Sequence, residues 1–283
     1  MPEPAEAPSF VIVGHVTLDL VPGGLVPGGT ATYAGRMARN LGERVGVVTS
    51  AAADFDFAAA LPGIQVASRP AGQTSTFENR YAGGRREQYI RAVATRLDAG
   101  AVPEAWRRAR TVLLAPLTNE VSPGVEDAFP GALRAATPQG WLRRWGTDGQ
   151  VRLEGWATLV ERLSRLDAVV LSEEDVQRDA ATIDMLRREI TLLVVTQGAR
   201  GARLFRQGAE RHFPPFPAGE VDPTGAGDVF AGAFLVELAR SGDPERACVF
   251  ANCAASFAVE APGAEGVPTR EEIAARLGAG VRG

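Results

Sequence analysis

The sequence predicts an α/β fold of three layers, αβα, with a largely parallel central sheet, and two observations lead to that prediction. Short apolar runs rich in β-branched residues alternate with longer segments of helical periodicity, a pattern typical of a parallel sheet covered by helices on both faces. The chain has 283 residues and is 45% hydrophobic, which is enough to bury a large core. No repeat or low-complexity linker divides it, so we expect one domain over 1–283 with a hairpin around 74–92 standing off as a flap.

The individual elements follow from local patterns. Strands are expected where apolar runs are short, at 10–20, 44–50, 111–116, 134–145, 167–172 and 190–198. Helices are expected where apolar residues recur every three or four positions, at 30–42, 156–166, from 173 onward, 225–240, 243–259 and 269–277. Segments 74–92 and 201–213 are predicted to be hairpins, and the Gly- and Pro-rich segment 21–29 is predicted to be a loop.

The composition excludes several classes of chemistry. The sequence contains no lysine, so all 30 residues of the Lys and Arg count are arginine. A Walker-A lysine, a Schiff-base lysine and the strand lysine of protein kinases are therefore ruled out. The only histidines are the distant His15 and His212, which leaves no local two-histidine zinc motif. The net charge is −4 without a basic block, so nucleic acid is not an expected partner.

Features of the termini and cysteines bear on the compartment. The first ten residues have neither a basic segment nor an apolar core, so they do not resemble a signal peptide. The most apolar long window, 247–261, contains Asn252 and Ser256, which favours a buried helix over a membrane span. Cys248 and Cys253 would lie about 500° apart around that helix, so a disulfide or metal pair is not expected and a cytoplasmic location is.

The stretch DPTGAGD at 222–228 suggests a chemical reaction. Gly225 and Gly227 allow turn conformations closed to larger residues, and an apolar, helix-like run follows directly. If a helix begins there, the NH groups of Gly225, Ala226 and Gly227 point into one cavity and form an anion hole suited to a phosphate undergoing transfer. An alcohol beside that phosphate can give its proton to Asp228 while its oxygen attacks, which is general-base catalysis.

Two other interpretations of this stretch stay open from the residues alone. Asp228 can be a plain helix cap after a Gly-rich turn, because Asp is a good N-cap residue. The letters GAGDVF also approach the dinucleotide-binding fingerprint, with Phe230 in place of its last glycine. That fingerprint belongs on an early β-α turn with an acidic ribose partner about 20 residues later, and neither condition is met here.

With these landmarks the chain resembles the PfkB family of carbohydrate kinases, which have the ribokinase-like fold. DPTGAGD is very similar to the second family signature, and GHVTLD, the GG at 28–29, a strand ending near 171, and VVTQGARGA follow the family order. The resemblance covers nearly the whole chain and implies an ATP-dependent kinase with a β lid over its active site. Because the span from Asp19 to Gly28 is short, we expect a reduced lid made mainly from 74–92, and a monomer or homodimer.

The resemblance implies a role for each matching residue. Asp228 is the expected catalytic base, with Gly225, Ala226 and Gly227 as the anion hole. The expected substrate site includes Asp19, which would bind hydroxyls, and Gly28 and Gly29, which would let the backbone approach the substrate. The expected nucleotide site comprises Thr196, Gly198, Gly201, Thr224 and Asn252.

The expected metal site departs from the family pattern. Many members have an Asn-x-x-Glu motif that organises waters around Mg²⁺, and here Ser172 and Asp175 of SEED occupy those positions. Asp175 keeps the charge with a shorter reach, so we expect Mg²⁺ to be held largely by phosphates and by water, with Asp175 acting through water. Asp222 lies, with Thr224, where many relatives bind a monovalent cation, which makes K⁺ a second candidate ion.

The substrate is the least constrained part of the resemblance. Tyr33 stands where ribokinase-type members have a sugar-binding asparagine, which argues against ribose. GGTATY, TSTFENRY, TPQGWLR and Ser172 are similar to an inositol-kinase-like branch, so we rank myo-inositol or another cyclic polyol before a nucleoside or a simple sugar. Further polar contacts to the substrate are predicted from Thr76, Glu78, Asn119 and Gln139. A non-catalytic sensor of sugars or nucleotides on the same fold is the alternative function.

Overall fold

The computed structural model describes residues 6–82 and 85–280, and a nine-stranded sheet forms its centre. The strand order is β15-β14-β13-β12-β9-β8-β1-β4-β5. The strands are β1 Phe10–Val13, β4 Val45–Ala51, β5 Gln65–Pro70, β8 Thr111–Leu114, β9 Leu133–Ala136, β12 Ala168–Ser172, β13 Leu192–Thr196, β14 Ala202–Arg206 and β15 Ala209–Phe213. All neighbours pair in parallel except β13–β14 and β14–β15, which confirms the largely parallel sheet.

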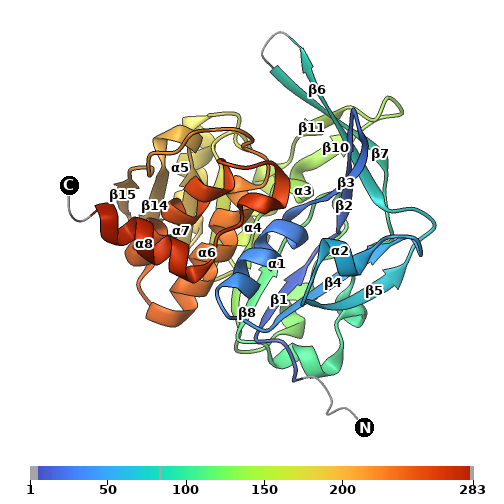
Figure 1. Ribbon diagram of the computed structural model, residues 1–283, viewed down its shortest axis with the longest axis horizontal. Helices are drawn as coiled ribbons and strands as arrows, with labels where there is room; N and C mark the ends of the chain where they lie inside the picture. The colour runs from blue at the N-terminus through green and yellow to red at the C-terminus, as the bar shows by residue number, and fades with distance from the viewer. Residues whose placement is uncertain (1–5, 83–84, 281–283) are drawn as a thin grey trace.

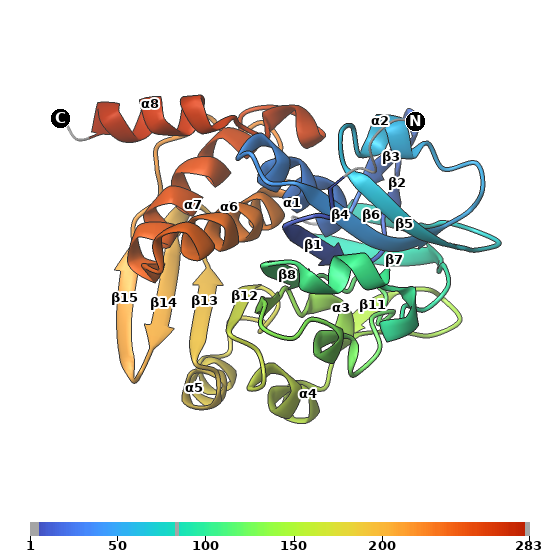
Figure 2. The same ribbon diagram turned by 90° about the horizontal axis from the view of Figure 1, so that it is seen from below.

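Helices cover both faces of this sheet, as Figure 2 shows, so the three-layer prediction is confirmed. One face carries α1 Thr30–Asn40, α6 Ala226–Ser241, α7 Pro244–Ala258 and α8 Arg270–Gly280, and the other carries α4 Trp156–Leu163 and α5 Ala180–Glu189. Each face has its own buried apolar cluster. α6 lies innermost on its face, since every residue from Val229 to Leu238 is buried. Among the described residues, no helix is both long and apolar enough to cross a membrane.

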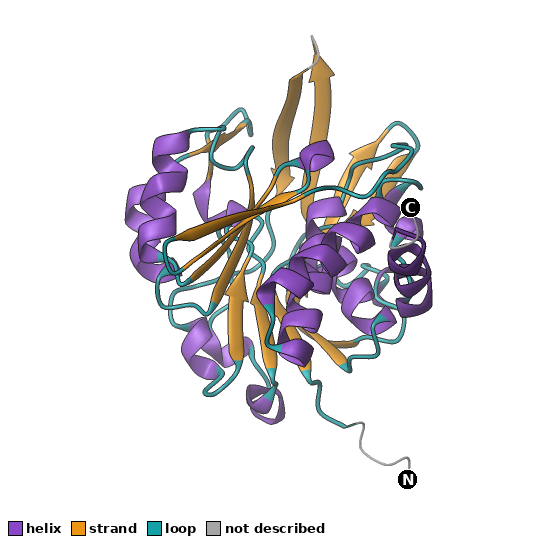
Figure 3. Cartoon of the chain, turned by 90° about the vertical axis from the view of Figure 1, so that its left-hand side faces the viewer, coloured by secondary structure: helices purple, strands orange, loops and turns teal. Residues whose placement is uncertain are grey.

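A second, four-stranded sheet stands off the main body as a lid (Figures 1 and 3). Its order is β3-β2-β6-β7, with β2 Thr17–Val21, β3 Gly24–Gly28, β6 Ser75–Ala82 and β7 Arg85–Ala92. The antiparallel β6–β7 pair confirms the hairpin predicted at 74–92, whose residues 83–84 lie outside the described residues. The loop predicted at 21–29 is wrong, because β3 pairs antiparallel with β2 and the pair joins β6 through a parallel ladder. The lid is therefore built from two hairpins.

Two further predictions are wrong, the helix expected from 173 and the strand expected at 134–145. The helix expected from 173 begins only at Ala180, because Gln177 and Arg178 adopt left-handed backbone angles (φ 50° and 57°) that a helix cannot contain. Asp179 then caps α5 by accepting hydrogen bonds from the NH groups of Ala181 and Thr182. The strand expected at 134–145 is divided into β9, the short helix α3 Gln139–Leu142, and β10 Arg143–Trp145, which pairs with β11 Val151–Leu153.

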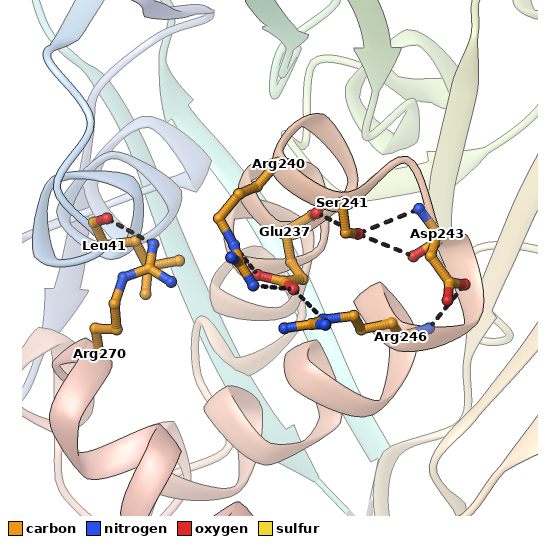
Figure 4. A network of polar contacts seen from close by, with 7 residues as sticks. All are labelled: Leu41, Glu237, Arg240, Ser241, Asp243, Arg246 and Arg270. Atoms are coloured by element: carbon orange, nitrogen blue, oxygen red, sulfur yellow. Dashed lines mark hydrogen bonds and ion pairs between the residues drawn. The ribbon is translucent and has the colours of Figure 1, made fainter.

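The C-terminal end of α6 is joined to α7 by an ionic network around a buried glutamate (Figure 4). Glu237 is fully buried and accepts hydrogen bonds from Arg240 at 2.7 and 2.9 Å and from Arg246 at 2.6 Å. Burial alone would raise the pKa of Glu237, but the two guanidinium groups outweigh it and lower the pKa. Asp243 caps the start of α7 through the NH groups of Glu245 and Arg246, so both helix ends at this corner are satisfied.

Candidate active site

The loop of residues 222–225 is held in place before α6 begins. Asp222 accepts hydrogen bonds from the NH groups of Thr224 at 2.9 Å and Gly263 at 3.0 Å, which ties this loop to the segment after α7. Burial would raise the pKa of Asp222, but these NH donors outweigh it and lower the pKa, so the carboxylate stays ionised. Gly225 is the N-cap of α6 with φ 80°, and a Cβ on it would lie 2.4 Å from the ring of Tyr33. Only glycine satisfies both conditions.

The start of α6 presents main-chain donors. Across residues 6–82 and 85–280, the NH groups of Gly225 and Gly227 have no hydrogen-bond acceptor. The NH of Ala226 makes a long bond of 3.3 Å to the carbonyl of Pro223. No side chain caps this end of α6. Unsatisfied donors at a helix N-terminus attract an anion, and the positive end of the helix dipole adds to the attraction.

Asp228 lies in the first turn of α6, beside these donors. Its Oδ1 accepts a hydrogen bond of 2.7 Å from the hydroxyl of Thr30, which is fully buried and is the first residue of α1. Burial of the carboxyl group raises the pKa of Asp228 to about 6, although the Thr30 hydroxyl and the Arg143 charge act in the opposite direction. A carboxylate with a pKa near neutrality is suited to accept a proton and release it again.

Charged groups from three other elements act on Asp228. Arg143 of β10 favours its ionised form, whereas Asp175 after β12 and Asp19 of β2 oppose it. The structure therefore brings together Asp19, Asp175 and Asp228, which were predicted separately. Arg143 is 8% exposed, and its guanidinium donates to the carbonyl of Leu117 and to Oε1 of Gln139, both at 2.9 Å. Gln139, predicted to bind substrate, thus holds Arg143.

The glycine pair at 28–29 is required by close packing around Asp19. A Cβ on Gly28 would lie 2.3 Å from Oδ2 of Asp19, and a Cβ on Gly29 would lie 2.8 Å from the Leu117 side chain. Gly29 also has φ 86° and serves as the N-cap of α1 without any side-chain cap. The N-termini of α1 and α6 are therefore both uncapped, and the Thr30–Asp228 hydrogen bond joins them.

The lid residues predicted to bind substrate have partners within the protein. Thr76 donates its hydroxyl to the carbonyl of Thr74 at 2.9 Å. Both carboxylate oxygens of Glu78 are paired, one with Arg80 at 2.6 Å and the other with Arg91 at 2.7 Å. These hydrogen bonds hold the pKa of Glu78 below its usual value. The assignment of these side chains to the substrate stays a prediction.

Asn119 lies at the edge of a different hollow. It has a left-handed backbone (φ 59°) and lines a cavity of about 370 Å³, together with Trp141, Arg144 and Arg162. Because side chains alternate along a strand, Arg144 lies on the opposite side of β10 from Arg143, the arginine that acts on Asp228. A contact between Asn119 and the substrate stays a prediction.

Three of the predicted nucleotide residues, Thr196, Gly198 and Gly201, lie at the end of β13 and in the loop that follows it. Gly201 (φ 87°) is required by packing, since a Cβ there would lie 2.1 Å from the carbonyl oxygen of Phe213. Gly198 (φ 57°) faces open space, and the hydroxyl of Thr196 makes a long bond of 3.4 Å to the Leu171 carbonyl. Thr224 is half-buried in the loop before α6.

Asn252 makes structural contacts within the protein. It is buried on α7, and its amide nitrogen donates to the carbonyls of Phe213 and Pro214, both at 3.1 Å. Both of its N–H bonds are thereby used, so only the side-chain oxygen is left for a nucleotide. The nucleotide contact of Asn252 stays a prediction.

The SEED segment connects two strand ends and contributes one carboxylate to the site. Oδ2 of Asp175 accepts a hydrogen bond of 2.9 Å from the NH of Ser172. Glu173 is paired with Arg200 and accepts a 3.0 Å bond from Gln197, which links this loop to the loop after β13. Within the described residues, no three His, Cys, Asp or Glu side chains are grouped to hold a metal ion. The carboxylates present therefore fit only an ion whose other ligands come from water or substrate.

Comparison with known proteins shows which family the chain resembles. Residues 164–270 match the family described as pfkB family carbohydrate kinase. This part of the chain is therefore similar to the PfkB family. Its relatives include the ribokinase of Bacillus subtilis (strain 168), which is 48% identical over 82 residues covering 29% of this chain and 28% of the ribokinase. They also include the cytidine kinase of Thermococcus kodakarensis, which is 28% identical over 263 residues covering 85% of this chain and 91% of that kinase.

A solved structure extends the similarity of the PfkB fold over most of the chain. A pyrophosphate-dependent kinase in the ribokinase family, complexed with a pyrophosphate analog and myo-inositol, superposes with a TM-score of 0.80. It is 21% identical, and the alignment covers 94% of this chain and 99% of that chain. The chain matches between 28% and 36% of the length of the first three curated relatives. These similarities establish the ribokinase-like fold.

Three residues beside Asp228 were missed or misinterpreted at the level of sequence. Thr30 follows the GG pair directly, and this position at a helix start was the available signal. Tyr33 was considered only as a substitution against ribose, whereas its ring packs on Gly225. Arg143 had no local signal, because its closeness to Asp228 depends on the pairing of β10 with β11.

Proposed function

We propose that the protein is an ATP-dependent kinase that transfers the γ-phosphate to a hydroxyl group of a small polyol, with myo-inositol as the first candidate. The observation that carries the proposal is the position of Asp228, a carboxylate with a pKa of about 6 beside unsatisfied NH groups at the start of α6. A base and an anion hole in contact are what transfer of a phosphoryl group to an alcohol requires. The same pair has no evident use in hydride transfer.

The proposed reaction balances with the groups present. The substrate hydroxyl gives its proton to Asp228 as its oxygen forms a bond to the γ-phosphorus, and the bond from that phosphorus to the β–γ bridging oxygen breaks. ADP leaves with the bond's electron pair, and the proton on Asp228 returns to solvent. Because Thr30 occupies Oδ1, the proton is accepted at Oδ2, which has no hydrogen-bond donor among the described residues. The NH groups of Gly225 and Gly227 stabilise the charge that develops on the phosphoryl oxygens.

Metal ions fit this site only in a supporting capacity. Mg²⁺ bound to the nucleotide would neutralise phosphate charge. We propose Asp175 as the side chain that meets its water shell, because its charge acts on Asp228. Asp222 is held ionised in the loop before α6, which suits the proposed K⁺ site at that loop. Both assignments remain proposals.

The choice of acceptor rests on the polar groups around Asp228. Asp19 can accept hydrogen bonds from two adjacent hydroxyls, and the missing side chains of Gly28 and Gly29 leave room for Asp19 and Leu117 at the start of α1. The structural similarity to a kinase complexed with myo-inositol supports a cyclic polyol, although the fold also serves nucleoside and ribose kinases. A nucleoside or simple sugar is the second candidate, and pyrophosphate is the second candidate donor.

A matrix of donors and acceptors tests the proposal. The purified protein would be incubated with Mg²⁺, with either ATP or pyrophosphate, and with myo-inositol, ribose, fructose or cytidine, and product would be followed by ³¹P NMR. We expect a phosphate ester with ATP and myo-inositol, and its loss in Asp228→Asn. A different productive pair would revise the substrate or donor. Binding of ligands without turnover under every pair would instead support the sensor function.

A further inference from the structure

Thr30 has a contact with the proposed base that the reaction alone does not explain. It is separated from Asp228 by 198 positions in sequence, yet its hydroxyl donates to Oδ1 at 2.7 Å. The side chain is fully buried and belongs to α1, whereas the carboxylate belongs to α6. The role that we assign to this contact rests on the proposed function, whereas the hydrogen bond itself does not depend on it.

We propose that Thr30 is a positioning residue that fixes one oxygen of the Asp228 carboxylate and so leaves the other oxygen to receive the substrate proton. A hydroxyl donates a single proton, and a carboxylate offers only acceptors, so this bond defines which oxygen is occupied. Oδ2 is the oxygen with no hydrogen-bond donor in the described part of the chain.

The hydrogen bond to Asp228 selects the direction of the Thr30 hydroxyl. In a helix a threonine side chain divides mainly between two χ1 rotamers, and in Thr30 the hydroxyl points to Asp228 at 2.7 Å. The backbone of Thr30 follows Gly29, whose φ of 86° only glycine adopts readily. Thr32 on the same helix provides a contrast, because its hydroxyl bonds back to the Gly28 carbonyl at 2.8 Å and does not contact Asp228.

The hydrogen bond also affects the charge of Asp228. The groups that act on this carboxylate are Thr30 and Tyr33 from α1, Arg143 from β10, Asp19 from β2 and Asp175 after β12. Burial, Asp175 and Asp19 raise its pKa, whereas Thr30 and Arg143 lower it. Removal of the Thr30 hydroxyl therefore raises the pKa of Asp228 further, and a purely structural threonine would leave that pKa unchanged.

The direct test is a titration that needs no turnover. The Asp228 carboxyl carbon would be followed by ¹³C NMR, with its signal assigned by its loss in Asp228→Asn. Thr30→Val is expected to move the midpoint upward from about 6 by roughly one to two pH units, the size of a hydrogen bond to a charged group. Thr30→Ser keeps the hydroxyl and is expected to stay near the parent midpoint. Thr32→Val is the matched control for loss of a buried hydroxyl on α1, with no expected shift.

The kinetic test uses the productive donor and acceptor. Thr30→Val is expected to lower kcat by about tenfold or more, to leave KM for the donor within about twofold, and to move the acid limb of the pH profile upward. Thr30→Ser should restore both. If Thr30→Val does not fold, Thr30→Ala makes the same hydroxyl deletion.

The proposal is overturned if the Asp228 midpoint is the same in Thr30→Val and the parent protein, or if Thr30→Ser behaves like Thr30→Val. Failure of the proposed function has a different signature. An inactive parent protein, or an Asp228→Asn variant with nearly full activity, rejects the kinase or the base, while the NMR titration still reports on Thr30.

Discussion

The two ends of α6 each carry a buried or half-buried carboxylate, and the pKa of the two carboxylates is shifted in opposite directions. At the C-terminal end, Glu237 is enclosed by Arg240 and Arg246, and its pKa is lowered (Figure 4). At the N-terminal end, Asp228 has one neutral donor, Thr30, and its pKa is raised to about 6. The same helix thus carries one carboxylate whose pKa is lowered by charged partners and one whose pKa is raised by burial, as the proposed general base requires.

The difference follows from what surrounds each carboxylate. A buried carboxylate is stabilised when charged donors satisfy its oxygens, and Glu237 has such donors from two side chains. Among the described residues, the hydrogen-bond donor to Asp228 is the neutral hydroxyl of Thr30. The negative charges of two other carboxylates, Asp175 and Asp19, raise its pKa. Incomplete satisfaction of this kind is destabilising, and it is common at sites that bind ligands or perform catalysis.

The largest expected effect is a difference in kcat between variants of Asp228 and Glu237. Asp228→Asn should lower kcat by about 10²- to 10⁴-fold, because the general base is lost while the shape is kept. Glu237→Gln should leave kcat within about twofold, because Glu237 lies at the other end of the helix. Steady-state kinetics of both variants with the productive substrate pair would measure this contrast. Activity of Asp228→Asn within about tenfold of the parent would show that the base is another residue.

The second effect tests the turn that presents the donors. Gly225→Ala should reduce the free energy of unfolding by about 1–3 kcal/mol, because Cβ would meet the Tyr33 ring and φ is 80°. Gly227→Ala is the matched control, since its Cβ would meet nothing within 4 Å. It should be neutral or stabilising by up to about 1 kcal/mol, owing to helix propensity. Urea denaturation measures both, and equal losses would contradict the packing described for Gly225.

The last prediction compares how the contributions of Asp228 and Glu237 to protein stability depend on pH. The pKa of Asp228 is raised in the folded protein from 3.8 to about 6, so its ionisation destabilises the fold as pH rises through that interval. Asp228→Asn should therefore have a higher Tm than the parent protein, and the difference in Tm should grow from pH 4 to pH 6. The pKa of Glu237 is lowered from 4.5, so its contribution is present above that pH and is lost as pH falls through the folded value.

Glu237→Gln provides the opposite half of that experiment. It should lower stability by about 1–2 kcal/mol at neutral pH, a modest amount because Arg240 and Arg246 are half exposed and can turn to water. The difference from the parent protein should shrink as pH falls below about 4.5. Thermal melts of both variants across pH 3–7 would measure it, and parallel pH curves for the two would contradict the contrast between the two ends of α6.

The sequence predicted those parts of the molecule that depend on local pattern. The helices at 225–240, 243–259 and 269–277 match α6, α7 and α8 within a few residues, and the 201–213 hairpin matches β14 and β15. The strand β3 was missed because its pairing with β2 and, through it, with β6 supplies hydrogen bonds that no local window contains. Long-range contacts decide such segments.

The residues of the candidate site also divide into those that local sequence predicted and those that depend on long-range contacts. Gly225 and Asp228 were identified because turn chemistry and a helix start are visible in seven consecutive residues. Thr30 and Arg143 were not, because their relation to Asp228 exists only after α1 and β10 are placed beside α6. The partners of Glu78 and Asn252 were also beyond the sequence, since each is satisfied by a residue of another strand or by main-chain carbonyls far along the chain.

The four-stranded sheet is joined directly to α1, the helix that carries Thr30. Gly28 ends β3 and Thr30 begins α1, so a single glycine separates the two. The direction of the Thr30 hydroxyl, and with it the hydrogen bond to Asp228, therefore depends on one backbone link to the paired strands.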